Sequence, residues 1–132
     1  MKRILIVEDE PHIIRILRLA LERNSYQVCS AIDGKEGLAS IQESEPDVLI
    51  TDIDMPVMSG DQLCKHIEAE MPDRKFLIIV LTSRAEIEHR QWSAEIPNLV
   101  FLEKPISIRR LVNQLEDYFA EAMPLEEKKV AG

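Results

Sequence analysis

The sequence predicts an α/β fold in which a doubly wound parallel sheet carries helices on both faces. Short apolar runs alternate with amphipathic stretches, giving five strand–helix units in strict order. Such alternation is typical of parallel strands joined by right-handed helical crossovers. In addition, residues 76–81 read Phe-Leu-Ile-Ile-Val-Leu without a polar side chain, which suits a strand buried on both sides.

Three of the expected strands lie in the first half of the chain, at residues 2–7, 26–31 and 48–50. A helix at residues 11–23 begins at Pro11, which suits a first helical turn, and repeats its apolar residues at helical spacing. A second helix follows Asp33 and Gly34, which we interpret as a turn and cap, and ends near residue 45.

The second half completes the alternation. Ser59 can cap a third helix that stops before Met71. The remaining elements are strands at 75–81 and 98–102, a weaker helix at 84–94 and an amphipathic helix at 108–119. Residues 123–132 are charged and rich in small residues, so we expect a disordered tail or linker after a domain at residues 1–122.

The composition limits the possible functions. A chain of 132 residues with 45% hydrophobic and 30% charged residues fits one ordinary globular domain. The net charge of -8 argues against binding to nucleic acid or to an anionic membrane. No apolar run approaches the roughly 20 residues that span a bilayer or follows the pattern of an export signal. We therefore expect a cytoplasmic domain in which Cys29 and Cys64 are free thiols.

The most informative stretch is residues 51–56, Thr-Asp-Ile-Asp-Met-Pro, which places Asp52 at the carboxyl end of the third strand. Ligands bind at this edge of open α/β sheets. If the first and third strands are neighbours, Glu8 and Asp9 converge on Asp52. Carboxylates so close together repel one another unless a cation neutralises them. Hard oxygen ligands of this kind suit Mg²⁺.

A metal ion beside a free carboxylate is suited to phosphoryl transfer, because the carboxylate can attack phosphorus while the metal neutralises the charged oxygens. Two helpers are then expected. A cation for the phosphoryl oxygens is available in Lys104, after the fifth strand, and a hydroxyl donor in Thr82, after the fourth.

With these residues in place, the chain resembles the receiver domain of bacterial two-component response regulators over about residues 2–120. The motifs that carry the resemblance are Glu8-Asp9-Glu10, Asp52-Ile53-Asp54-Met55-Pro56 with Gly60, Thr82-Ser83 and Lys104-Pro105. Their order along the chain is more specific than any one of them. The resemblance implies a flavodoxin-like sheet in the order 2-1-3-4-5 with five helices on its two faces.

The resemblance also implies a chemistry. Asp52 would accept a phosphoryl group from a sensor histidine kinase or a histidine phosphotransfer protein and become 4-aspartylphosphate. Thr82 and Lys104 would contact the phosphoryl oxygens. The implied cofactor is Mg²⁺, bound by the carboxylates of Asp9 and Asp52, by the main-chain carbonyl of Asp54, and by Glu8 through water.

A conformational switch would follow from the added charge. Thr82 would move toward the new oxygens, and Phe101 would rotate into the space that Thr82 vacates. The face formed by the helix at 84–94, the strand at 98–102 and the last helix would then select a downstream protein. Pro105, after an expected cis peptide bond, would belong to this partner surface, and a phosphorylation-dependent homodimer through it is possible within the family.

Some features depart from the family pattern. Residues 95–98, Glu-Ile-Pro-Asn, stand where many relatives carry Gly-Ala, and Phe101 lacks the hydroxyl group of a tyrosine. Asp54 is acidic at a position that borders the phosphoryl pocket. We predict that Asp54 and Arg84 tune the lifetime of the acyl phosphate.

Two other functions are considered. Asp52-x-Asp54 after a strand also resembles the nucleophile motif of haloacid-dehalogenase-type phosphatases, although there it usually follows the first strand. A protein-binding module independent of phosphate is the second alternative. For Trp92 the sequence favours neither packing nor partner contact. The output, whether a downstream protein or an effector domain of a longer chain, stays open.

Overall fold

The computed structural model describes residues 1–83 and 90–121. It contains a five-stranded sheet in the order β2-β1-β3-β4-β5, with every neighbouring pair parallel. The strands are β1 (Arg3–Val7), β2 (Gln27–Ala31), β3 (Val48–Asp52), β4 (Leu77–Thr82) and β5 (Leu99–Glu103). The α-helices of the described part are α1 (Pro11–Arg23), α2 (Gly34–Glu43), α3 (Gly60–Glu70) and α5 (Ile108–Glu121). The predicted fold class and strand order are confirmed.

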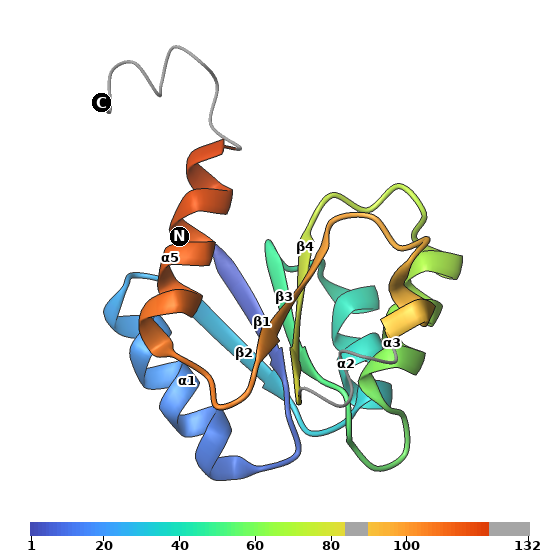
Figure 1. Cartoon of the computed structure of the whole chain (residues 1–132), viewed down its shortest axis with the longest axis horizontal. Coiled ribbons are helices and arrows are strands. Elements are labelled where there is room, and N and C mark those ends of the chain that lie inside the picture. The colour runs from blue at the N-terminus through green and yellow to red at the C-terminus, as the bar shows by residue number, and fades with distance from the viewer. Residues whose placement is uncertain (84–89, 122–132) are drawn as a thin grey trace.

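Helices cover both faces of the sheet (Figure 1), with α1 and α5 on one face and α2 and α3 on the other. Each face has its own apolar core. Leu17 and Leu21 of α1 pack with Leu111 and Leu115 of α5 in one core, whereas α3 contributes Leu63, Cys64 and Ile67 to the other. The alternation of side chains along each strand supplies both cores at once.

The two central strands explain the unbroken apolar runs in the sequence. Every residue of β3 and β4 is buried, as expected for strands covered on both sides. Asp52 and Thr82 are the last residues of these strands, so each of these polar residues ends a strand that is buried in the core.

The helix starts follow the expected capping chemistry. Pro11 is the first residue of α1. Asp33 caps α2, and its carboxylate accepts a hydrogen bond of 2.8 Å from the Glu36 amide. Ser59 is the N-cap residue of α3, and its amide donates to the Gln62 side chain at 3.1 Å. Such local bonds satisfy backbone groups that have no partner inside the helix.

The helix predicted at residues 84–94 lies only partly within the described residues. Residues 84–89 are outside them, and the described end forms a 3-10 helix, η1 (Arg90–Ser93). The tail predicted at residues 123–132 also lies outside the described residues. Of the helices that are described, none is long and apolar enough to span a bilayer.

The outer edge of the sheet at β2 is joined to α1 by one side chain. The guanidinium group of Arg18 donates to the Val28 carbonyl at 3.0 Å and to the Ser30 hydroxyl at 3.1 Å. Arg18 therefore fastens the helix to the edge strand through the strand's own backbone.

Candidate functional site

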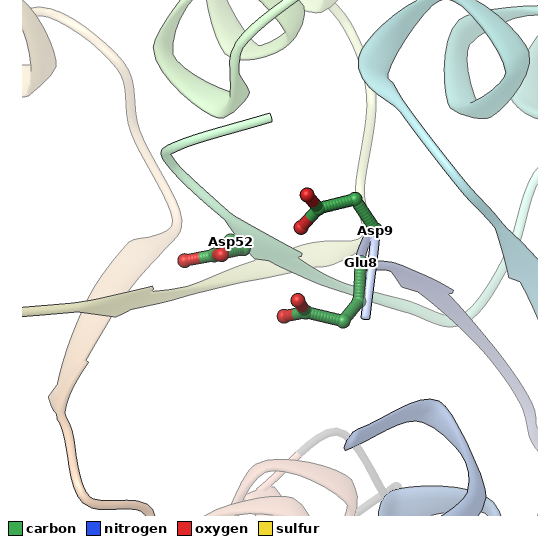
Figure 2. A group of neighbouring side chains, drawn as sticks. All are labelled: Glu8, Asp9 and Asp52. Carbon is green, nitrogen blue, oxygen red and sulfur yellow. The ribbon is translucent and has the colours of Figure 1, made fainter. Parts of the chain in front are cut away.

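Three carboxylates gather where β1 and β3 end. Glu8 and Asp9 follow directly on β1, and Asp52 ends β3 (Figure 2). Each offers an oxygen atom within 4.8 Å of the others. Glu8 and Asp52 are buried, whereas Asp9 is exposed. β1 pairs with both β2 and β3, so the site lies at the point where the sheet order reverses, as expected for a ligand site in this class of fold.

Asp52 is held by two hydrogen bonds to one of its oxygens. The ammonium group of Lys104 lies 2.7 Å from Oδ1, and the amide of Ile53 donates to the same atom at 2.9 Å. The Asp52 side chain is only 6% exposed and that of Lys104 is 41% exposed. The partly exposed lysine side chain therefore extends inward to a carboxylate that is almost fully buried.

The Glu8 carboxyl group has a raised pKa. Burial, followed by the negative charge of Asp52, raises the pKa of the Glu8 carboxyl group to about 7. The amide of Glu10, at 3.3 Å, and the charge of Lys104 act in the opposite direction. The expected mutual repulsion of these carboxylates is therefore present at Glu8, and a divalent cation would relieve it.

Thr82 joins the site from the neighbouring strand. Its side chain is fully buried, and its carbonyl accepts a hydrogen bond of 2.7 Å from the Lys104 amide. This bond fixes the ends of β4 and β5 relative to each other. The peptide bond between Lys104 and Pro105 is cis, as the resemblance implied.

Phe101 lies on the same face of the sheet as Thr82. Val80 is paired with Phe101 across β4 and β5, and Thr82 is two residues beyond Val80, so their side chains emerge on one side. Phe101 is half-buried, packs against the core beneath α2 and α3, and contacts the ring of Trp92.

The loop between β3 and α3 follows directly on Asp52. Asp54 is exposed, two residues beyond β3, and the side-chain cluster with Glu8 and Asp52 does not include its carboxylate. Val57 has a φ of 70°, and the Met58 amide donates to the Pro56 carbonyl at 2.7 Å across it. This is a γ-turn, which is rare and strained at a β-branched residue.

A groove of about 430 Å³ opens beside the carboxylates. Glu8 and Lys104 are among its lining residues, and its other walls come from α1 and from the segment after β5. Pro105 also lines it, and the apolar lining residues include Ile13, Ile16, Leu17, Ile106 and Ile108.

Sequence reasoning missed two contributors to this site. The backbone amide of Ile53 donates a hydrogen bond to the Asp52 side chain, and a pattern of side chains cannot predict a backbone donor. The contact between Trp92 and Phe101, with ring centroids 5.9 Å apart, joins residues nine positions apart. Only the return of the chain along β5 brings them together.

The fold and the site define a class: an α/β domain with an acidic pocket, a lysine and a hydroxyl at the switch point, suited to a cation and a phosphoryl group. The chain belongs to the family of response regulator receiver domains, whose model matches residues 4–116. It is thus a phosphoaccepting receiver domain of the two-component type, with a signalling role, and not a phosphatase of the haloacid-dehalogenase type.

Similar proteins support this assignment. The phosphate regulon transcriptional regulatory protein PhoB of Escherichia coli is 31% identical over 98% of this chain and 56% of its own length. The alkaline phosphatase synthesis transcriptional regulatory protein PhoP of Bacillus subtilis is 32% identical over 83% of this chain and 45% of its own length. The chain spans about half the length of these curated relatives.

Solved structures agree with the fold. The chemotaxis response regulator CheY4 of Vibrio cholerae has a TM-score of 0.80 at 30% identity, covering 89% of this chain and 98% of its own. The response regulator TrrA of Thermotoga maritima, solved in complex with Mg²⁺ and BeF, has a TM-score of 0.78 at 29% identity, with the same two coverages of 89% and 98%.

Proposed function

We propose that Asp52 is the phosphoacceptor of this receiver domain and that its carboxylate takes a phosphoryl group from a phosphohistidine donor. The observation that carries this assignment is the pairing of a buried carboxylate with Lys104 at 2.7 Å, next to two further acids. One Asp52 oxygen accepts from Lys104 and Ile53. The other oxygen is the candidate nucleophile.

The residues present fit a Mg²⁺ ion. The donor set is made of carboxylate oxygens within 4.8 Å of one another. Burial and the charge of Asp52 both disfavour the ionised form of Glu8, and a cation would offset them. We propose that Asp9 and Asp52 bind the metal through carboxylates, Glu8 through water and Asp54 through its main-chain carbonyl. When bound, Mg²⁺ would neutralise charge on the phosphoryl oxygens.

Lys104 and Thr82 would bind the phosphoryl oxygens from the other side. Lys104 already extends to Asp52, so a phosphoryl group there would find the ammonium within reach. Thr82 lies at the end of the adjacent strand, in register with Glu103, the residue before Lys104. Movement of Thr82 would open space on the face of the sheet that carries Phe101. The Phe101 ring would then rotate inward and act as the switch.

The phosphodonor would be a sensor histidine kinase or a histidine phosphotransfer protein. The groove beside Lys104 supports this, because the apolar residues Ile16 and Ile106 line the same groove as Glu8 and Lys104. A donor seated there would present its phosphohistidine to Asp52. Pro105, which lines the same groove, would contact a partner.

The output is a protein contact. We propose residues 1–122 as the receiver unit, acting on a downstream protein or on an effector domain, with homodimerisation on phosphorylation as one form of output. Asp54 and Arg84 would tune the lifetime of the acyl phosphate, although Arg84 lies outside the described residues. Equal dephosphorylation rates in Asp54→Asn, Arg84→Ala and the wild type would contradict that tuning.

The decisive experiment is thermal unfolding with Mg²⁺ and beryllium fluoride, a mimic of the aspartyl phosphate. A ligand that binds only the folded state raises stability by mass action. We expect a clear rise in melting temperature in the wild type that is absent in Asp52→Asn. No rise in either protein would overturn the assignment and favour a binding module independent of phosphate.

A further inference from the structure

We propose that Trp92 is a positioning residue that holds Phe101 in its resting place and thereby sets how readily the phosphoryl site switches the domain. This inference rests on the proposed function of Asp52 and Phe101. Its starting point is the contact between the two rings, whose centroids are 5.9 Å apart at an interplanar angle of 74°.

The contact has the geometry of an attractive aromatic pair. Edge-to-face rings with centroids 4.5–7 Å apart stabilise each other beyond the apolar area that they bury. Trp92 and Phe101 are both half-buried against the core beneath α2 and α3. The indole therefore lies alongside the ring that the proposed switch would move.

The sheet register connects this pair to the phosphoryl site. Phe101 is paired with Val80, and Thr82 follows two residues later on the same face. A displacement of Thr82 toward Asp52 would open space for the Phe101 ring on this face. A ring that turns toward Thr82 leaves the edge of the indole, so the Trp92 contact stabilises the resting arrangement and opposes the switched one.

If the Trp92 contact opposes the switched conformation, removing it should increase the affinity for a ligand that favours that conformation. A ligand that favours a minor conformation binds more tightly when the competing conformation is destabilised. Trp92→Leu keeps an apolar side chain but removes the ring, so apparent affinity for beryllium fluoride with Mg²⁺ should rise about two- to tenfold. Trp92→Phe, which keeps an aromatic ring, should stay closer to the wild type.

Trp92 is also the one tryptophan of the sequence, so the emission of the protein reports on the surroundings of this side chain, which include the Phe101 ring. Beryllium fluoride with Mg²⁺ should change the emission of the wild type. The change in emission should be absent in Asp52→Asn. It should be much smaller in Phe101→Leu, because the indole has no contact with an aromatic ring at residue 101 in that variant.

The full experiment measures beryllium fluoride affinity by calorimetry in the wild type, Trp92→Leu, Phe101→Leu and the double variant. Non-additivity identifies residues that act through one another, so Trp92→Leu should have no effect once Phe101 is leucine. Phe119→Leu is the matched control: it removes a ring that pairs with Tyr26 at 5.7 Å and with Tyr118 at 5.3 Å, at the core beneath α1 and α5. It should lower stability without changing affinity.

The outcomes separate the two proposals. Unchanged or weaker affinity in Trp92→Leu, or an equal effect in the Phe101→Leu background, would overturn the role of Trp92 while the wild type still binds the mimic. A wild type that does not bind the mimic would overturn the proposed function, and the role of Trp92 with it.

Discussion

Gly60, the first residue of α3, lies directly against the main-chain carbonyl of Asp52. A Cβ atom at Gly60 would be 1.9 Å from that oxygen, and the Gly60 amide donates to the Ile53 carbonyl at 2.8 Å. The start of α3 therefore rests on the backbone of the residue that carries the candidate nucleophile. Only a residue without a side chain allows this approach.

Gly60→Ala should consequently destabilise the domain by about 1–3 kcal/mol, because overpacking against backbone forces the backbone to move. It should also weaken Mg²⁺ binding, since Asp52 moves with its carbonyl. Urea unfolding and metal titration would measure both effects. Gly37→Ala is the control. Its Cβ would also be crowded, but by a side-chain methyl of Val7 at 2.8 Å and not by backbone, and alanine favours the helix, so its loss of stability should be smaller. An equal loss in the two variants would contradict the explanation.

Lys104→Met should lower the stability of the metal-free protein by about 1 kcal/mol, a value reduced by the partial exposure of the lysine. The cause is the loss of the 2.7 Å contact with a carboxylate that is 6% exposed, beside two other acids. In an Asp52→Asn background the same substitution should cost much less. Urea unfolding in a chelating buffer gives this double-mutant cycle, and equal costs in both backgrounds would show that the pair is not coupled.

Glu8 should make the metal-free protein less stable as pH rises from about 4.5 to about 7. The folded state raises the pKa of Glu8 from 4.5 to about 7, so in this window it holds a proton that the unfolded chain has released. The stability that Glu8 contributes is fully present below its pKa in the unfolded chain, and it is lost as pH rises through its pKa in the folded state. One such group changes the unfolding equilibrium by at most about tenfold per pH unit.

Glu8→Gln, which cannot ionise, should remove that part of the pH dependence. The measurement is urea unfolding across the window with a chelator present. Saturating Mg²⁺ should flatten the wild-type profile, because the metal favours the ionised carboxylate. Glu22→Gln, on the exposed part of α1, is the control and should keep the wild-type pH profile of stability. A wild-type pH profile in Glu8→Gln would refute the role of Glu8.

Val57→Asn should raise stability by about 0.5–1 kcal/mol. Val57 has a φ of 70° and is 75% exposed, so it gains little packing while adopting a conformation that costs a β-branched residue about 1–2 kcal/mol. Asparagine tolerates positive φ better. Thermal unfolding would measure the change, with Ile32→Asn as the control at an apolar residue that is 55% exposed and has no positive φ. A loss of stability at Val57 would show that its side chain packs usefully.

The fold could be predicted from the sequence because the apolar runs, the residues at helix starts and the expected strand order all indicate the same architecture. The unbroken apolar runs match the buried central strands β3 and β4, and Pro11, Asp33 and Ser59 stand where helices begin. The gathering of Glu8, Asp9 and Asp52 followed from strand order alone, because parallel strands place their carboxyl ends at one edge.

Other features depend on contacts that no local pattern encodes. The γ-turn at Val57 contradicts the preference of its own residue type, so propensity could not predict it. The Ile53 donor is a backbone group. Trp92 has no periodicity that distinguishes core from surface, and its neighbour is known only once β5 is placed beside β4.

The bond from Arg18 to the Val28 carbonyl has a consequence for association. Edge strands invite other chains to extend a sheet by adding a strand, and proteins block this with charged side chains. Here the guanidinium group occupies an acceptor on the outer side of β2, so an incoming strand would have to displace it. Extension of the sheet by strand addition at β2 is thereby disfavoured.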